Sequence, residues 1–207
     1  APWVALAIGA GIGVVPSLLE EDISLDTYRK FLAEKVRKGE IKLEGKDVTK
    51  EFKLPYFRDV NTELSQVTLK IPVSELEKQV EFDRPHSWQQ TIDALTQPSE
   101  YLVDLMRQVD TDKHENLLHR QGFGKAYFDT RLLDIFKVLA FVKENITYIS
   151  DDSNGDAKRA QSNPYYNRQD YWKFPEQTLI DGFGDCDDFT VTAAGMLKSY
   201  WANKSDK

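Results

Sequence analysis

Cysteine and histidine are scarce in this chain. The single cysteine, Cys186, excludes an internal disulfide framework. The only histidines are His86, His114 and His119, and we expect all three to be surface or capping residues. The five-residue spacing of the last two does not place a pair of metal ligands on one face of a helix. A histidine-rich metal centre is therefore not expected.

Basic charge is also in short supply. Lysine and arginine number 27 against 34 aspartate and glutamate residues, which gives a net charge of -7, and the bases are mixed with acids along the chain. No basic stripe is present to release counterions from phosphates, so a nucleic-acid partner is not expected. Hydrophobic residues make up 41% and aromatics 12% of the 207 residues, enough for one large or two small folded domains.

The first 19 residues carry no charge. As a helix, the segment Ala1–Leu19 would extend on the order of 28 Å, and its small residues Ala5, Gly9 and Gly13 recur every four positions. A membrane-inserted or membrane-associated anchor is favoured, which would make the protein membrane-associated, in a periplasmic or other extracytoplasmic compartment or in a virion. The alternatives are a signal-peptide core without its basic region, or a segment buried against its own domain or another chain.

Residues 20–130 indicate a mixed α and β region. Helical spacing of apolar residues predicts a helix over 25–36, and alternation predicts short strands over 41–53, with a turn at Gly45, and over 67–73. Pro72 suggests an edge strand or the end of a strand. Three serines in suitable positions are expected to begin helices, namely Ser74, Ser87 and Ser99. No chemistry beyond scaffolding or partner binding is evident in this region.

The pattern sharpens after residue 131. The stretch R-L-L-D-I-F-K-V-L-A-F-V-K-E-N-I predicts a helix with a wide, mostly buried apolar face, followed by an extended piece over 146–150 and a polar loop over 151–161. A second buried helix is predicted near the C-terminal end. Its expected apolar face consists of Phe189, Val191, Ala194, Leu197 and Trp201.

The segment G-F-G-D-C-D-D, residues 182–188, carries the candidate chemistry. A cysteine at a helix N-terminus has its thiolate stabilised by the helix dipole, and nearby backbone N–H groups can hold an oxyanion. Gly184 lets the backbone approach a substrate closely. The aspartates Asp185, Asp187 and Asp188 oppose a further negative charge, a conflict that a bound Ca²⁺ would remove. The plainer alternative is that the last two only cap the helix.

The order of a helix, N-I-T-Y, a loop, Y-W-K-F-P-E-Q-T-L, G-x-G-D-C-D-D and a second helix resembles the transglutaminase-like superfamily of papain-type thiol enzymes. The resemblance covers residues 132–201, about a third of the chain. It implies an α+β fold in which Cys186 opens a buried helix and acts as the nucleophile. The family includes transglutaminases, peptidases, amidases and bacterial transglutaminase-like cysteine proteinases. In a calcium-dependent branch of the last group, acidic residues beside the cysteine bind Ca²⁺, and Asp185, Asp187 and Asp188 match them.

Three parts follow from these patterns: a hydrophobic segment, 1–19; a mixed α/β region, 20–130; and a partial transglutaminase-like domain, 131–207. In the resembled family the base and its orienting group lie downstream of the cysteine, but here only 21 residues follow and none is histidine. The chain is a fragment cut after Lys207, or it borrows an upstream histidine or one from another chain, or it is an inactive relic. The first and third alternatives are favoured, because borrowing an upstream base requires a permuted topology.

The leading hypothesis is a thiol enzyme, such as a protease or amidase, that acts on a peptide or protein substrate through a thioester on Cys186. Trp172 is expected to flank the substrate or to pack against the cysteine helix, and Gly184 to line the substrate site. The alternative is a non-enzymatic structural or interaction protein of a membrane or multimeric assembly, such as a virion, that retains the helix as scaffold.

Overall fold

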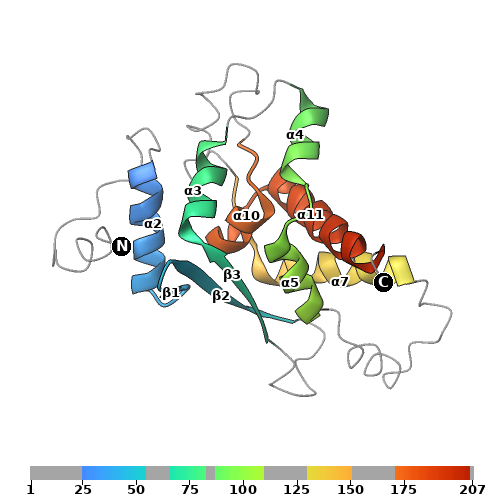
Figure 1. Cartoon of the computed structure of the whole chain (residues 1–207), viewed down its shortest axis with the longest axis horizontal. Coiled ribbons are helices and arrows are strands. Elements are labelled where there is room, and N and C mark those ends of the chain that lie inside the picture. The colour runs from blue at the N-terminus through green and yellow to red at the C-terminus, as the bar shows by residue number, and fades with distance from the viewer. Residues whose placement is uncertain (1–24, 55–65, 83–86, 110–129, 151–170, 206–207) are drawn as a thin grey trace.

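The computed structural model describes residues 25–54, 66–82, 87–109, 130–150 and 171–205 (Figure 1). Helices and small sheets are combined in one chain, which confirms the α+β class. The segment Ala1–Leu19 and the expected loop over 151–161 lie outside the described residues. Within the described ranges, no helix has both the length and the apolar composition that crossing a membrane requires.

Three antiparallel strands form the main sheet in the order β1-β2-β3. They are β1 (Lys42–Glu44), β2 (Asp47–Lys53) and β3 (Gln66–Pro72), and Leu43 pairs with Val48 across the first turn. Gly45, in that turn, has a φ of 67°, a conformation that favours glycine. The strands predicted from alternation are confirmed, and Pro72 is the last residue of an outer strand, where its missing N–H costs no ladder bond.

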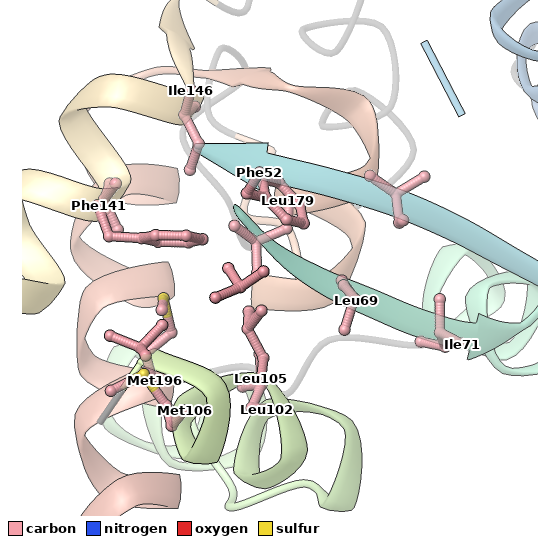
Figure 2. Close-up of a cluster of buried hydrophobic side chains, with 14 of the residues drawn as sticks. Phe52, Leu69, Ile71, Leu102, Leu105, Met106, Phe141, Ile146, Leu179 and Met196 are labelled. Carbon is pink, nitrogen blue, oxygen red and sulfur yellow. The ribbon is translucent and has the colours of Figure 1, made fainter. Parts of the chain in front are cut away.

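One face of the sheet is buried against helices. Alternate residues of β2 and β3 pair across the strands and project to this face, namely Val48, Lys50, Phe52, Val67, Leu69 and Ile71. Figure 2 shows side chains of this face meeting others from α5 (Glu100–Val109), α7 (Thr130–Asn145), α10 (Pro175–Asp181) and α11 (Cys186–Ser205). The hydrophobic core therefore joins elements from the beginning and the end of the described chain.

Helix α2 (Leu25–Arg37) confirms the predicted N-terminal helix, and it buries Tyr28 and Leu32. It lies beside α3 (Val73–Glu81), and Arg29 Nε donates to Glu77 Oε1 at 2.6 Å across the pair. Helix α4 (Trp88–Leu95) follows, and α5 comes next. Tyr28 and Leu32 belong to the same core cluster as the inward side chains of the sheet.

Two of the three predicted serine caps are confirmed. Ser87 Oγ accepts from the Gln90 N–H at 3.2 Å, and Ser99 Oγ accepts from the Leu102 N–H at 3.2 Å. The prediction for Ser74 is wrong, because α3 begins one residue earlier, at Val73, with Pro72 as its N-cap. Strand β3 runs directly into this helix, and the Val73 N–H donates to the Lys46 carbonyl at 2.9 Å. A carbonyl in the turn between β1 and β2, rather than a serine side chain, therefore accepts the first N–H of this helix.

Helix α7 is buried along a narrower stripe than the sequence predicts. Val138, Phe141 and Val142 are buried, whereas Phe136 and Leu139 are 58% and 50% exposed, so the expectation of a wide buried face is wrong for those two. These three buried apolar residues are spaced by three and one, on the side of α7 that also buries Asp134 and Lys137, and α7 contacts the sheet and α11.

At the C-terminal end of α7, the Asn145 side chain extends the ladder of β2. Its amide accepts from the Lys53 N–H at 3.0 Å and donates to the Lys53 carbonyl at 2.9 Å. This side chain occupies the position that a further strand residue would take, and it therefore fixes α7 against the end of the sheet.

Helix α11 is buried on more than one side. It contacts α5, α7 and α10 (Figure 1). It buries Val191, Ala193, Met196 and Tyr200. The predicted single face is therefore wrong in part: Phe189, Ala194 and Leu197 are only partly buried, and Trp201 is 36% exposed. A helix packed between several partners has no single apolar stripe, so a 3.6-residue pattern locates its face poorly.

A second, two-stranded parallel sheet joins α7 to the cysteine segment. Strand β4 (Thr147–Tyr148) confirms the predicted extended piece, and it pairs with β5 (Phe183–Gly184). The Thr147 N–H donates to the Gly182 carbonyl at 2.9 Å, and the Ile149 N–H donates to the Gly184 carbonyl at 3.0 Å. The residues immediately before Cys186 are thus held by backbone bonds from a segment more than 30 positions earlier.

Candidate functional site

The turn between α10 and α11 requires glycine at two positions. Gly182 ends α10 in the left-handed region with a φ of 76°, and its N–H donates to the Thr178 carbonyl at 2.8 Å. A Cβ on Gly182 would also lie 2.8 Å from Lys50 Nζ. At Gly184 a Cβ would lie 2.6 Å from the Cβ of Asp188. Because neither position has room for a Cβ, the backbone packs closely against Lys50 and Asp188 as it enters α11.

Cys186 is the first residue of the 20-residue helix α11, as the sequence predicts, and it is exposed and free of any disulfide. The helix ladder begins when the Phe189 N–H donates to the Asp185 carbonyl at 3.0 Å. The N–H groups of Cys186, Asp187 and Asp188 therefore fall in the first turn, where no preceding helical carbonyl is available to them. These donors and the helix dipole place positive potential at the thiol.

Two of the three flanking aspartates gather with the thiol. One carboxylate oxygen each from Asp185 and Asp187 and the Cys186 Sγ all lie within 4.8 Å of one another. Neither carboxylate oxygen of Asp187 reaches solvent or accepts a hydrogen bond within the described part of the chain. Such a carboxylate is costly to bury without a partner, and carboxylate oxygens are the ligands that Ca²⁺ prefers. Asp185 and Asp187 therefore fit a calcium ion, whereas the soft thiol does not.

Asp188 does not belong to this group, because its fully buried side chain points to Lys173. Asp188 Oδ1 accepts from the Lys173 backbone N–H at 2.9 Å, and Asp188 Oδ2 lies 3.3 Å from Lys173 Nζ. One lysine thus engages both oxygens of one carboxylate. The third of the expected metal ligands is instead tied to the segment before α10.

Lys173 Nζ has further partners at the same turn. It donates to the Phe183 carbonyl at 3.1 Å, lies 4.4 Å from the centroid of the Phe183 ring, and lies 3.9 Å from Asp181 Oδ2. The Tyr28 hydroxyl donates to Asp181 Oδ1 at 3.2 Å. A buried polar network therefore runs from α2 through the end of α10 to the first turn of α11.

A partly buried lysine, Lys50, reaches the same turn from the sheet. Lys50 Nζ donates to the Leu179 carbonyl at 2.5 Å and to the Ile180 carbonyl at 3.2 Å, at the C-terminal end of α10. Burial, and then the nearby charge of Lys35, lower the pKa of Lys50 to about 8 from its ordinary 10.5, although Asp181 acts in the opposite direction. Lysine near helix C-terminal carbonyls is favourable, and this contact holds α10 against β2.

Glu176 is the buried acid of α10. Ser99 Oγ donates to Glu176 Oε1, and Gln79 Nε2 donates to Glu176 Oε2 at 3.3 Å, so the side chain links α10 to α3 and to the start of α5. Complete burial raises the pKa of Glu176 above its ordinary 4.5, more strongly than its hydrogen bonds lower it. Glu176 therefore joins α3, α5 and α10, the helix that precedes the cysteine turn.

The expected substrate residues lie in different settings. Trp172 is 8% exposed and packs with Leu95 and with Val191 of α11. Gly184 is buried and pairs with Tyr148 in the parallel sheet. Tyr148 is 62% exposed, and its ring centroid lies 6.2 Å from that of Phe189, which is three residues after Cys186 on the same side of the helix. An aromatic pair therefore lies one helical turn after Cys186, and the sequence reasoning did not identify it.

Lys173 and Lys50 were also missed as parts of this site. Lys173 stands within the motif Y-W-K-F-P, and Lys50 occupies the inward register of an alternating strand, between Val48 and Phe52. A charged residue in the inward row of a strand is a usable signal, because it must find a buried partner. For Lys173 no such periodic signal exists. All three histidines lie outside the described residues.

Comparisons of the chain with protein-family models, with curated proteins and with solved structures gave no match.

Proposed function

We propose that this chain carries the nucleophile of a thiol enzyme that acts on amide or peptide bonds and has a transglutaminase-like, papain-type arrangement. The observation that carries the proposal is the exposed Cys186 at the first residue of a long helix, reached through a tight turn that favours glycine at two positions. The resemblance of residues 132–201 to that superfamily supports the same chemistry.

In this mechanism the Cys186 sulfur attacks the carbonyl carbon of the substrate. The negative charge that develops on the carbonyl oxygen is met by first-turn N–H groups of α11, which are already oriented by the helix. The C–N bond then breaks, a general base carries the thiol proton to the leaving amine, and a thioester remains on Cys186. Water or another amine takes the acyl group in the second step, which gives hydrolysis or transfer.

Substrates are expected to be peptides or proteins with an extended segment beside the thiol. Tyr148 and Phe189 offer apolar ring surface at the edge of the site, and Gly184 allows backbone to approach. We assign to this aromatic pair the side chain next to the scissile bond. Trp172 supports the cysteine helix from behind, since it packs with Val191.

Asp185 and Asp187 are the residues that would hold Ca²⁺, because their carboxylate oxygens converge and those of Asp187 have no other partner within the described residues. When bound, the ion supplies positive charge that offsets the acids beside the thiol. Asp188 is assigned no metal role, since Lys173 engages its oxygens.

A second candidate function is non-enzymatic: a structural or interaction protein in a membrane or a large assembly. The exposed Phe136 and Leu139 of α7 favour it, because large apolar side chains at neighbouring turns of a surface helix are suited to contact another protein. Residues 1–19 would supply a further contact to a membrane or a partner chain.

An activated ester such as p-nitrophenyl acetate tests the enzyme proposal, because nitrophenolate leaves without needing a proton from the protein. We expect a burst of nitrophenolate of about one equivalent per chain and an acetyl group on the Cys186 peptide by mass spectrometry. The Cys186→Ala variant should give no burst. A burst of the same size in that variant, or none in the wild type with or without Ca²⁺, would contradict the enzyme proposal and leave the interaction candidate.

A further inference from the structure

The negative charge around Cys186 presents a problem for a thiolate nucleophile. Asp185 and Asp187 are adjacent to Cys186 in sequence, Asp188 is two positions after it, and Asp181 lies at the end of the preceding helix. Each ionised carboxylate near a sulfur anion opposes its formation. A calcium ion on Asp185 and Asp187 would offset only that pair, so the two inward-facing carboxylates, Asp181 and Asp188, need a different partner.

Lys173 is that partner. Its side chain is fully buried, and its ammonium lies 3.3 Å from Asp188 Oδ2 and 3.9 Å from Asp181 Oδ2. A charge buried this completely is retained in folded proteins only where it is paired and hydrogen-bonded, and here one cation faces two anions. The negative charge behind the thiol is thereby reduced from inside the protein.

Lys173 also fixes the backbone on either side of Cys186. The Lys173 ammonium donates to the Phe183 carbonyl at 3.1 Å, and the Lys173 backbone N–H donates to Asp188 Oδ1 at 2.9 Å. Phe183 lies in β5, before the thiol, and Asp188 lies in the first turn of α11, after it. Lys173 therefore holds the chain on both sides of Cys186.

We propose that Lys173 is the positioning residue of the Cys186 site, which neutralises the inward aspartates and clamps the turn that presents the thiol. This inference rests on the thiol chemistry proposed above. It predicts that the charge of Lys173 acts on the electrostatic potential at the sulfur, an effect that a merely structural lysine in the core would not have.

Two alkylating reagents of similar size separate charge from exposure. Iodoacetamide is neutral and iodoacetate is anionic, and both react with the same thiolate, so the ratio of their rate constants at Cys186 cancels changes in thiolate population and in access. At fixed pH and low salt, Lys173→Met should lower the iodoacetate-to-iodoacetamide ratio roughly two- to fivefold, the effect of one unit charge acting at short range through a partly hydrated surface. Asp188→Asn should raise the ratio by a similar factor.

Lys173→Met leaves buried carboxylates uncompensated, so it is paired with a double variant. Lys173→Met with Asp188→Asn removes both charges of the closest ion pair, and its ratio should return to within a factor of two of the wild type. Lys78→Met changes the net charge of the protein by the same amount at an exposed residue of α3, and its ratio should equal that of the wild type.

The outcomes are distinguishable. A double variant whose ratio stays at the raised value of Asp188→Asn, or a Lys173→Met variant whose ratio equals that of the wild type, would overturn the role of Lys173, even where Cys186 itself reacts rapidly with both reagents. Equal shifts in Lys78→Met would also overturn it, since they would reflect net charge alone. A wild-type Cys186 that forms no acyl adduct with the activated ester would instead count against the proposed function.

Discussion

Replacing Lys50 with methionine should change how the stability of this protein depends on pH. Lys50 projects from β2 into the apolar row formed with Val48 and Phe52, and its ammonium meets two carbonyls at the end of α10. The pKa of Lys50 is lowered from 10.5 to about 8 in the folded protein, mainly by burial. Between these two values the unfolded chain binds more protons than the folded one.

The sign and size of the effect follow from that difference. Where the unfolded state binds more protons, the free energy of unfolding rises with pH. The stability that the folded protein gains from deprotonation of Lys50 therefore increases from about pH 8 to pH 10.5 and is absent below pH 8. A shift from 10.5 to about 8 corresponds to about 3 kcal/mol, at about 1.4 kcal/mol for each pH unit. Wild type should therefore gain about 3 kcal/mol relative to Lys50→Met over this range.

Urea unfolding at several pH values between 7 and 10.5 measures this gain. Other lysines and tyrosines titrate over the same range, so the quantity to compare is the difference between wild type and Lys50→Met at each pH. Lys53→Met, at an exposed residue of the same strand, is the matched control and should follow the wild-type curve. Parallel curves for wild type and Lys50→Met would refute the assignment of a buried, readily deprotonated amine at this position.

Three further perturbations test the scaffold behind the site. The pKa of buried Glu176 is raised above 4.5, so the folded wild type binds more protons than the unfolded chain and loses stability as the pH rises above 4.5. Glu176→Gln should not show this loss. Identical pH profiles of the two proteins in urea unfolding would contradict this. Gly184→Ala should lower the free energy of unfolding by about 1–3 kcal/mol, because its Cβ would lie 2.6 Å from that of Asp188, and an unchanged urea midpoint would show that the turn has room. Ser87→Ala should cost about 1 kcal/mol through loss of its bond from the Gln90 N–H, whereas Ser74→Ala should cost nothing measurable; equal effects would show that the cap does not contribute.

Local patterns predicted much of the fold. The alternation in β2 and β3, the periodicity of α2 and the caps at Ser87 and Ser99 all depend on residues close in sequence, and each is present in the structure. Ser74 fails because β3 leads without a break into α3, so a tertiary bond from Val73 to Lys46 replaces the cap. Trp201 was assigned to the wrong side because α11 packs against several helices rather than one.

The sequence likewise predicted one part of the candidate site and missed another. Glycines before an acid-flanked cysteine predict a tight turn into a helix, and Cys186 does begin α11. The partition of the aspartates is not visible in sequence, since Asp185 and Asp187 gather at the thiol while Asp188 turns inward. That difference depends on Lys173, 15 positions before Asp188, and no periodic pattern links the two. Sequence reasoning cannot assign ion pairs between residues, such as Lys173 and Asp188, that only the tertiary structure brings together.

The reactivity of the Cys186 thiol tests the central claim most directly. The rate constant for iodoacetamide at Cys186, followed by mass spectrometry at neutral pH, is to be compared between the folded protein and the same chain unfolded in urea. With Ca²⁺ present to offset Asp185 and Asp187, the exposed sulfur at the helix N-terminus should react about ten times faster in the folded protein than in urea, because first-turn N–H groups and the helix dipole face it. Labelling that is slower in the folded protein and becomes faster only in urea would contradict the account.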